Sequence, residues 1–104
     1  MDINGIYTVI SAKFSAAYWA FPENDAPEMP FVTIFEEGTD NFGADNKVYH
    51  VRKLISVELY TRTKSPDDEA TLEGIFNEND LFWNKTETHL DDENAYEVLY
   101  TLEV

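Results

Sequence analysis

The stretch from Asp40 to Thr61 constrains the fold most, because it joins a turn-rich acidic loop to a long strand. Gly38 to Asn46 combines two glycines with Asn and Asp, which tolerate positive backbone angles and form local turn bonds. This composition predicts a loop that carries Phe42. From Val48 to Thr61 the chain predicts a strand, long enough to be a central strand or the arm of a hairpin. The alternating apolar side chains of this strand include Ile55, Val57 and Leu59.

The flanking segments predict two helices and four more strands. Apolar residues recur every three or four positions in the first segment and predict a helix from about Asp2 to Lys13, whose ends carry the charges that a helix dipole favours. Ser65 as an N-cap, followed by Pro66 and carboxylates, predicts a second helix that extends to about Asn79. The other predicted strands are Ala16 to Phe21, Phe31 to Glu37, Lys85 to Leu90 and Ala95 to Val104.

The order of these elements is helix, three strands, helix, two strands. It predicts an α+β fold in which two helices cover one face of a mainly antiparallel sheet of about five strands. Pro22 to Pro30 holds three prolines and predicts an exposed loop, and the acidic turn from Asp91 to Asn94 joins the last two strands as a hairpin. A chain of 104 residues builds one core, so we expect a single domain over residues 1–104.

The charge of the chain argues against one class of function. Lys and Arg number 7 and Asp and Glu number 21, which gives a formal net charge of -14 at pH 7. Tight binding of phosphates needs clustered cations, so we expect no tight or sequence-specific binding of DNA. A pore lined with carboxylates would still let a duplex slide through without sticking. Solubility alone is also a sufficient reason for so acidic a surface.

Cysteine content and hydropathy bear on the compartment. The chain contains no cysteine, which excludes disulfides and thiolate metal sites and suits a reducing cytoplasm. No stretch approaches the roughly 20 apolar residues that a membrane span needs, and the N-terminal residues lack the basic start and apolar run of a signal peptide. We therefore expect neither membrane insertion nor secretion.

Motifs for catalysis and cofactor binding are missing from the sequence. His50 and His89 each lack a second imidazole three or four residues away, and the oxygen-rich segments at Asp40 to Asn46 and Asp91 to Asn94 lack the ligand order of a calcium loop. Neither a nucleotide-binding glycine pattern nor a GxSxG elbow occurs. We expect no metal, no cofactor and no enzymatic activity. A small hydrolase built on paired carboxylates is the remaining catalytic alternative.

The aromatic side chains are more numerous than one small core readily hides. Phe, Trp and Tyr make up 14% of the chain. Some are expected at a protein interface, where aromatics are enriched, or else they face the two helices. Phe42 is the strongest interface candidate, because a polar, glycine-bearing loop does not easily fold back into the core.

A resemblance to a known family rests on short pieces spread over nearly the whole chain. They are the proline-bearing loop before Pro30-Phe31-Val32, Asp40-Asn41-Phe42 with Ala44-Asp45, Lys47-Val48-Tyr49-His50, Glu58-Leu59-Tyr60-Thr61, the acidic helix from Pro66 to Glu78, Phe82 with Lys85-Thr86-Glu87-Thr88, and Tyr96-Glu97-Val98-Leu99-Tyr100. In their order and spacing they resemble the tail-terminator and tail-completion proteins at the neck of long-tailed bacteriophages, especially those that infect Gram-positive bacteria.

The resemblance implies an α+β protein that forms a ring, usually a hexamer, on the completed tail tube. Such a ring provides the surface that joins the filled head. The implied partners are the tail-tube protein and a head-completion protein, and genomic DNA passes through without specific binding. The implied location is the neck of the virion, and the host cytoplasm during assembly. Interfaces would do this work, with no catalytic residue.

Contacts between copies are predicted within the segment from Asp40 to Thr61. The predicted contact residues are Asp40, Asn41, Phe42, Asp45, Lys47, Tyr49, Arg52 and Lys53. Six copies at -14 each carry a large negative charge, so assembly must bury little of it or pair it with cations of a neighbour. The candidates for that pairing are Lys47, Arg52, Lys53 and Lys85.

Two other functions stay open at this point. One is another neck role, such as a head-completion or stopper protein, which shares small size and ring assembly. The other belongs to a different class, an acidic decoy that mimics DNA and inhibits a basic host protein, because regularly spaced carboxylates can imitate phosphates.

Overall fold

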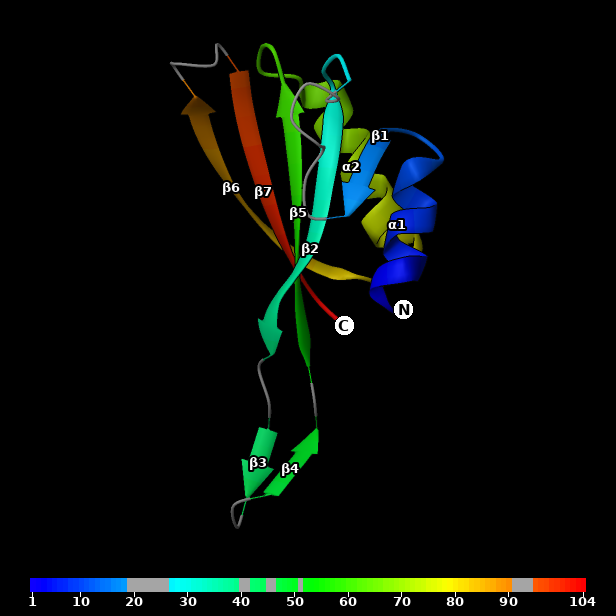
Figure 1. Cartoon of the computed structure of the whole chain (residues 1–104), viewed down its shortest axis with the longest axis vertical. Coiled ribbons are helices and arrows are strands. Elements are labelled where there is room, and N and C mark those ends of the chain that lie inside the picture. Colours follow the sequence, from blue (N-terminus) through cyan, green and yellow to red (C-terminus); the bar gives the residue numbers. More distant parts are fainter. Residues whose placement is uncertain (19–26, 40–41, 45–46, 51, 91–94) are drawn as a thin grey trace.

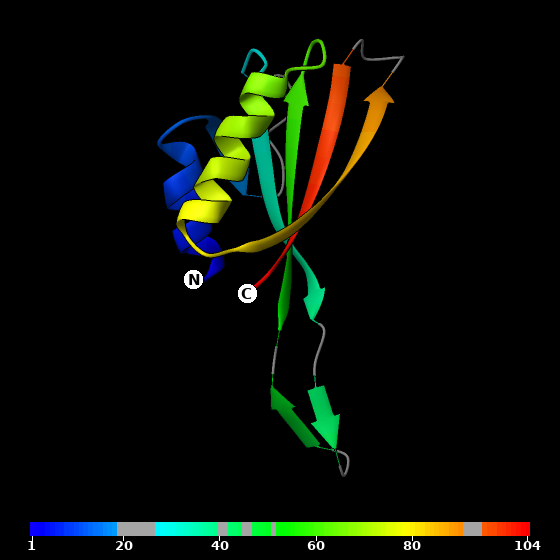
Figure 2. The ribbon, with the colours of Figure 1, turned by 180° about the vertical axis from the view of Figure 1, so that it is seen from behind.

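The computed structural model describes residues 1–18, 27–39, 42–44, 47–50, 52–90 and 95–104. Its elements are the helices α1 (Ile3–Ser11) and α2 (Pro66–Glu78) and the strands β1 (Ser15–Tyr18), β2 (Phe31–Thr39), β3 (Phe42–Ala44), β4 (Lys47–His50), β5 (Lys53–Thr61), β6 (Phe82–Leu90) and β7 (Ala95–Glu103). The α+β prediction is confirmed: both helices lie on one face of a five-stranded, mostly antiparallel sheet (Figure 1, Figure 2). The short strands β3 and β4 form a separate two-stranded sheet.

The five-stranded sheet is built around β5. Its strand order is β1-β2-β5-β7-β6, and β5 runs antiparallel to β2 on one side and to β7 on the other. β6 pairs antiparallel with β7 at one edge, which confirms the predicted hairpin, although residues 91–94 of its turn lie outside the described residues. At the opposite edge β1 runs parallel to β2, which makes the sheet mixed.

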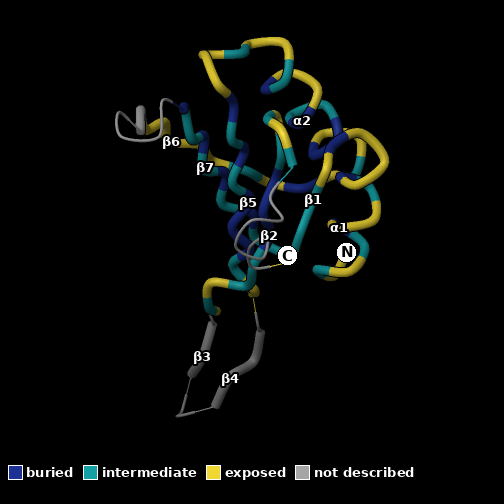
Figure 3. Tube along the Cα trace, turned by 45° about the horizontal axis from the view of Figure 1, so that its top comes forward, coloured by how far each residue is buried: buried dark blue, intermediate teal, exposed yellow. Residues whose placement is uncertain are grey.

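The core lies between the helices and the central strands, because alternate residues of those strands face the helices. Val57 of β5 is fully buried and pairs with Ile34 of β2 on one side and with Tyr100 of β7 on the other. The ring of Tyr100 packs edge-on against Phe76 of α2, with 5.2 Å between ring centroids. Figure 3 shows the burial concentrated on these strands and on the inner sides of the helices. The helices contribute Ile6, Ile10, Leu72, Ile75 and Phe76.

Local hydrogen bonds fix the ends of both helices. The Asp2 carboxylate caps α1 by accepting from the Gly5 N–H at 2.9 Å. Ser65 caps α2, with Pro66 at the first helical position, as predicted. At the other end of α2, Asp80 adopts a left-handed backbone conformation with φ of 56°, which turns the chain into β6.

Several predicted boundaries differ from the structure. α1 ends at Ser11, so Lys13 does not lie in its last turn. The prediction of one loop from Gly38 to Asn46 was wrong, because Gly38 ends up in β2 and Phe42–Ala44 forms β3. Pairing with β4 outweighs the local turn preference there. The single strand predicted from Val48 to Thr61 is divided into β4 and β5, and β6 begins at Phe82, before the predicted start.

The proline-bearing loop from Pro22 to Pro30 is described only in part. Of the loop from Pro22 to Pro30, residues 22–26 lie outside the described residues, and residues 27–30 belong to no helix or strand. No helix in the described part of the chain is long and apolar enough to span a membrane.

Leu59→Ala should lower the free energy of unfolding by about 2–5 kcal/mol, because Leu59 is fully buried and its truncation leaves a cavity in a packed core. Leu54→Ala removes the same atoms from a half-buried position on the same strand, so its loss should be smaller. Urea unfolding of both variants measures the difference. Equal losses would contradict the placement of these two side chains.

Candidate functional site

The most distinctive feature of the molecule is an arm that projects beyond the helix-covered sheet (Figure 1). We use the term arm for β3 and β4, which connect the end of β2 to the start of β5. The two strands are antiparallel, with Ala44 opposite Lys47, and only two residues separate them in the sequence. The molecule measures 49 × 28 × 22 Å, and its radius of gyration is 14.8 Å where a compact domain of this length has about 13 Å.

The strands that lead to the arm are shaped by a bulge. The β2–β5 register shifts between Glu36 and Gly38, and such an irregularity bends a strand and increases its twist. Glu37, between them, accepts a hydrogen bond from the buried Ser56 hydroxyl at 2.9 Å. A two-stranded hairpin is at best marginally stable by itself, so contact with another surface would stabilise the arm.

At the root of the arm the body presents a mixed basic and apolar surface. The backbones of Lys53 and Val104 exchange two hydrogen bonds of 2.9 and 3.0 Å. Arg52 Nη1 lies 3.0 Å from Glu103 Oε2. A shallow depression of about 450 Å³ is lined by Arg52, Phe82, Glu103 and Val104. Phe82 is 63% exposed, more than any other aromatic residue whose burial is described.

Charge is divided unevenly between the arm segment, which we define as residues 40–53 and which contains the arm, and the rest of the chain. The segment from Asp40 to Lys53 carries three cationic side chains and two carboxylates, while the remaining residues carry four and nineteen. Its formal charge is therefore +1, against -15 elsewhere. Another acidic copy of the chain meets the least repulsion at this segment.

A second polar cluster joins α2 to the sheet. Glu69 is only 4% exposed, and its two carboxylate oxygens lie 2.7 Å from Lys64 Nζ and 3.1 Å from Lys85 Nζ. The Lys64 contact is an ion pair and not a well-directed hydrogen bond. Lys85 also donates to Glu73 at 2.8 Å, and the same Glu73 oxygen accepts from the Tyr100 hydroxyl at 2.7 Å.

The cluster keeps its groups in their ordinary charge states at neutral pH. Burial by itself raises the pKa of Glu69, but the adjacent ammonium groups of Lys64 and Lys85 outweigh it, so the pKa is lowered. The hydrogen bond to Glu73 raises the pKa of Lys85, and burial raises that of Tyr100. Glu69 is thus ionised while Lys85 and Tyr100 are protonated. The cluster is a tie between helix and sheet and not a site poised for proton transfer.

The residues predicted to contact neighbouring copies fall into three groups. Three lie outside the described residues: Asp40, Asn41 and Asp45. Three lie in the arm strands: Phe42, Lys47 and Tyr49. The last two, Arg52 and Lys53, are exposed at the root of the arm. Contacts of all eight with another copy stay a prediction. Lys85, also proposed for pairing between copies, binds Glu69 and Glu73 of its own chain.

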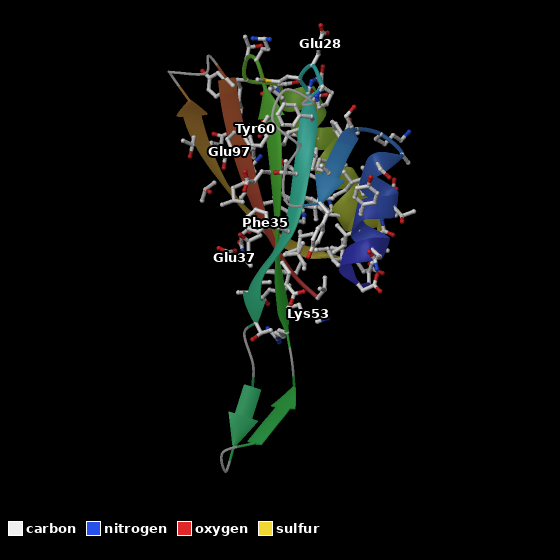
Figure 4. All side chains as sticks on the ribbon, viewed as in Figure 1. Glu28, Phe35, Glu37, Lys53, Tyr60 and Glu97 are labelled. Atoms are coloured by element: carbon white, nitrogen blue, oxygen red, sulfur yellow. The ribbon has the colours of Figure 1, made fainter. Side chains whose placement is uncertain are left out.

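The aromatic side chains divide between the two faces of the sheet. Trp83 and Tyr100 pack edge-on with centroids 5.7 Å apart, on the face that α2 covers. On the opposite face the rings of Phe31 and Tyr60 stack at 5.0 Å, and Figure 4 shows Phe35 and Tyr60 along that face. Of the two placements that the sequence left open, packing against a helix is confirmed for Trp83 and Tyr100, and placement at a protein interface stays a prediction. No helix among the described residues covers the half-buried second set.

The two histidines lie in strands, His50 in β4 and His89 in β6. Among the residues whose placement is described, no group of three or more His, Asp or Glu side chains could hold a metal ion. Comparison of the chain with protein-family models, curated proteins and solved structures finds no match in any of the three. The function is therefore inferred from the geometry of the arm, together with the resemblance noted in the sequence.

Replacing Glu69 by Gln should destabilise the protein at neutral pH by about 1–2 kcal/mol, because it removes the carboxylate that Lys64 and Lys85 share, and both lysines are partly exposed. The folded-state pKa of Glu69 is lowered, so its contribution is present above the unfolded pKa and is lost as pH falls through the folded pKa.

Stability of the wild type should therefore fall more steeply than that of Glu69→Gln below about pH 4.5, the ordinary pKa of this group. Denaturant unfolding at a series of pH values measures both curves. Glu78→Gln, at an exposed position on the same helix, is the matched control and should follow the wild type. Parallel curves for wild type and Glu69→Gln would contradict the assigned pKa shift.

Proposed function

We propose that this protein is a structural component of the neck of a long-tailed bacteriophage. Several copies, six by the resemblance, form a ring that caps the completed tail tube and offers the surface to which the filled head joins. The work consists of contacts between proteins, made first in the host cytoplasm and kept in the virion. The tail-tube protein lies on one side of the ring and a head-completion protein on the other.

The observation that carries this proposal is the arm. A domain of 104 residues extends its two central antiparallel strands into a hairpin that has no helix over it within the described residues. A hairpin of that kind supports the body little, because only its root is attached to the core. It is well suited to bind another surface through its backbone edges and its side chains.

The division of charge also supports assembly from repeated copies. Lys47, Arg52 and Lys53 belong to the one segment of the chain described above as net positive, and each neighbouring copy is strongly acidic outside that segment. An arm that contacts the body of the next copy makes a heterologous interface, which closes into a ring when the rotation between copies completes a circle. Acidic walls on such a ring would repel the DNA backbone and leave the passage clear.

The arm also favours a neck role over the DNA-mimic alternative. A mimic presents carboxylates at the spacing of phosphates to a basic partner, and the arm segment adds cations where such a surface needs anions. The head-completion and stopper roles use the same features as the terminator role and are separated from it by experiment.

Electron microscopy of particles from a phage that lacks this chain tests the proposal. We expect tails of abnormal length that are not joined to filled heads, because a tube without its cap has neither an end point nor a joining surface. Supplying the wild-type chain from a plasmid should restore normal particles and serves as the control. Tails of normal length that fail to join heads would assign the head-completion role instead. Normal-length tails joined to heads would refute the proposal.

A further inference from the structure

Strand β6 forms an open edge of the five-stranded sheet. It is the last strand in the order β1-β2-β5-β7-β6, and none of the described residues pairs with its outer side (Figure 1). Its register with β7 is unbroken from Phe82, opposite Glu103, to Leu90, opposite Ala95. The side chains from Asn84 to Thr88 are all exposed. An exposed, regular edge of nine residues presents unpaired N–H and C=O groups to any strand that can align with it.

Two of the devices that protect such an edge are missing from β6. The strand contains no proline and no bulge. Both charged side chains of the strand already have partners in their own chain, Lys85 with Glu69 and Glu73 of α2 and Glu87 with Lys64. The opposite edge differs, since β1 has only four residues and lies beside α1 (Figure 2). Of the two edges, β6 is therefore the one built to accept another strand.

The sequence of β6 is complementary to its own reversed copy. In an antiparallel pair centred on Thr86, Thr86 faces Thr86 of the second copy, and Lys85 faces Glu87 of the second copy on both sides of the centre. Asn84 then faces Thr88. Opposite charges and hydrogen-bonding side chains directly across from each other stabilise antiparallel strands. In this register even-numbered residues face even-numbered residues, and odd-numbered residues face odd-numbered ones. Residues whose backbone N–H and C=O groups point away from β7 therefore face the same residues of the second copy, as an antiparallel pair requires.

Neighbouring registers are disfavoured by the same residues. Moving the centre by one residue places Lys85 opposite Lys85 in one direction and Glu87 opposite Glu87 in the other. Like charges directly across from each other destabilise a strand pair. Only the Thr86 centre, of these three, places each charge of the strand opposite a charge of the other sign, so that the ion pairs that Lys85 and Glu87 make in their own chain continue across the contact.

We infer that β6 is a self-association edge, at which a second copy of this chain pairs antiparallel about Thr86. The two five-stranded sheets then form one continuous sheet. Each copy has one such edge, so the contact is two-fold and closed, unlike the heterologous arm contacts of a ring. This inference does not rest on the proposed function. Pairing at β6 covers the backbone groups that would otherwise recruit unrelated strands.

The test compares Thr86→Lys with Thr88→Lys in the full chain. Both substitutions place a lysine at an exposed threonine on the same face of the same strand. In Thr86→Lys the new lysine would face its own copy across the two-fold axis, whereas in Thr88→Lys it would face Asn84. Sedimentation velocity at about 0.15 M salt, where charges are screened beyond about 8 Å, reports the mass of each species. We expect wild type and Thr88→Lys to form a dimer of twice 12.0 kDa, and Thr86→Lys to dissociate with a dissociation constant raised roughly tenfold or more.

A mixing experiment shows whether Thr86 lies on the axis. Thr86→Glu alone should also be monomeric, but equal amounts of Thr86→Lys and Thr86→Glu should form a heterodimer, because the facing charges are then opposite. Recovery of the dimer also shows that both variants are folded. A wild type that stays monomeric at millimolar concentration, equal weakening by Thr86→Lys and Thr88→Lys, or failure of the mixture to dimerise would each overturn the inference. None of these results depends on whether the protein caps tails.

Discussion

The pairing and burial of strand β5 hold the fold together. This strand is paired along both edges, with β2 and with β7, and its alternate residues Ile55, Val57 and Leu59 are fully buried under the helices. The helices stay in place because their apolar residues pack on this strand and its neighbours. The same strand continues backwards through its start at Lys53 into the arm. The arm has no core of its own, but it is attached to a strand that is paired along both edges. That strand sets the direction in which the arm projects.

An excess of negative charge is tolerated because the buried carboxylate is paired. Glu69 lies against the sheet with Lys64 and Lys85, and Lys85 is shared with Glu73. An unpaired buried carboxylate would cost more free energy than the ion pair contributes to stability. The cluster therefore fixes the position of α2 on β6 and β7. Most other carboxylates of the described residues are at least partly exposed, and Lys53 at the root of the arm is exposed as well.

Those features that depend on local spacing could be predicted from the sequence. The alternation in β5 and β7 and the Ser65 cap of α2 define the fold class and the order of the main elements. The strand from Val48 was predicted to be a central strand or the arm of a hairpin, but its partner β3 was missed. Gly43 and the neighbouring Asn and Asp residues favour turns locally, while β3 depends on pairing with a separate segment. Glu69 was missed because carboxylates at a helix start are usually solvated. Its spacing from Glu73 and Phe76 places it on the buried side of α2 and could have revealed it.

We propose that the arm acts between molecules and contributes little to the fold of its own chain. Thr39 and Lys53 face each other in the β2–β5 register, so an Asn-Gly pair that replaces residues 40–52 can join them as a two-residue hairpin turn. The most direct measurement adds this shortened chain, in purified form, to tails that lack the protein and counts those that become joined to heads. We expect the shortened chain to unfold at the wild-type temperature and to leave all of the tails unjoined to heads. Joining at the wild-type level, or a chain that no longer folds, would contradict it.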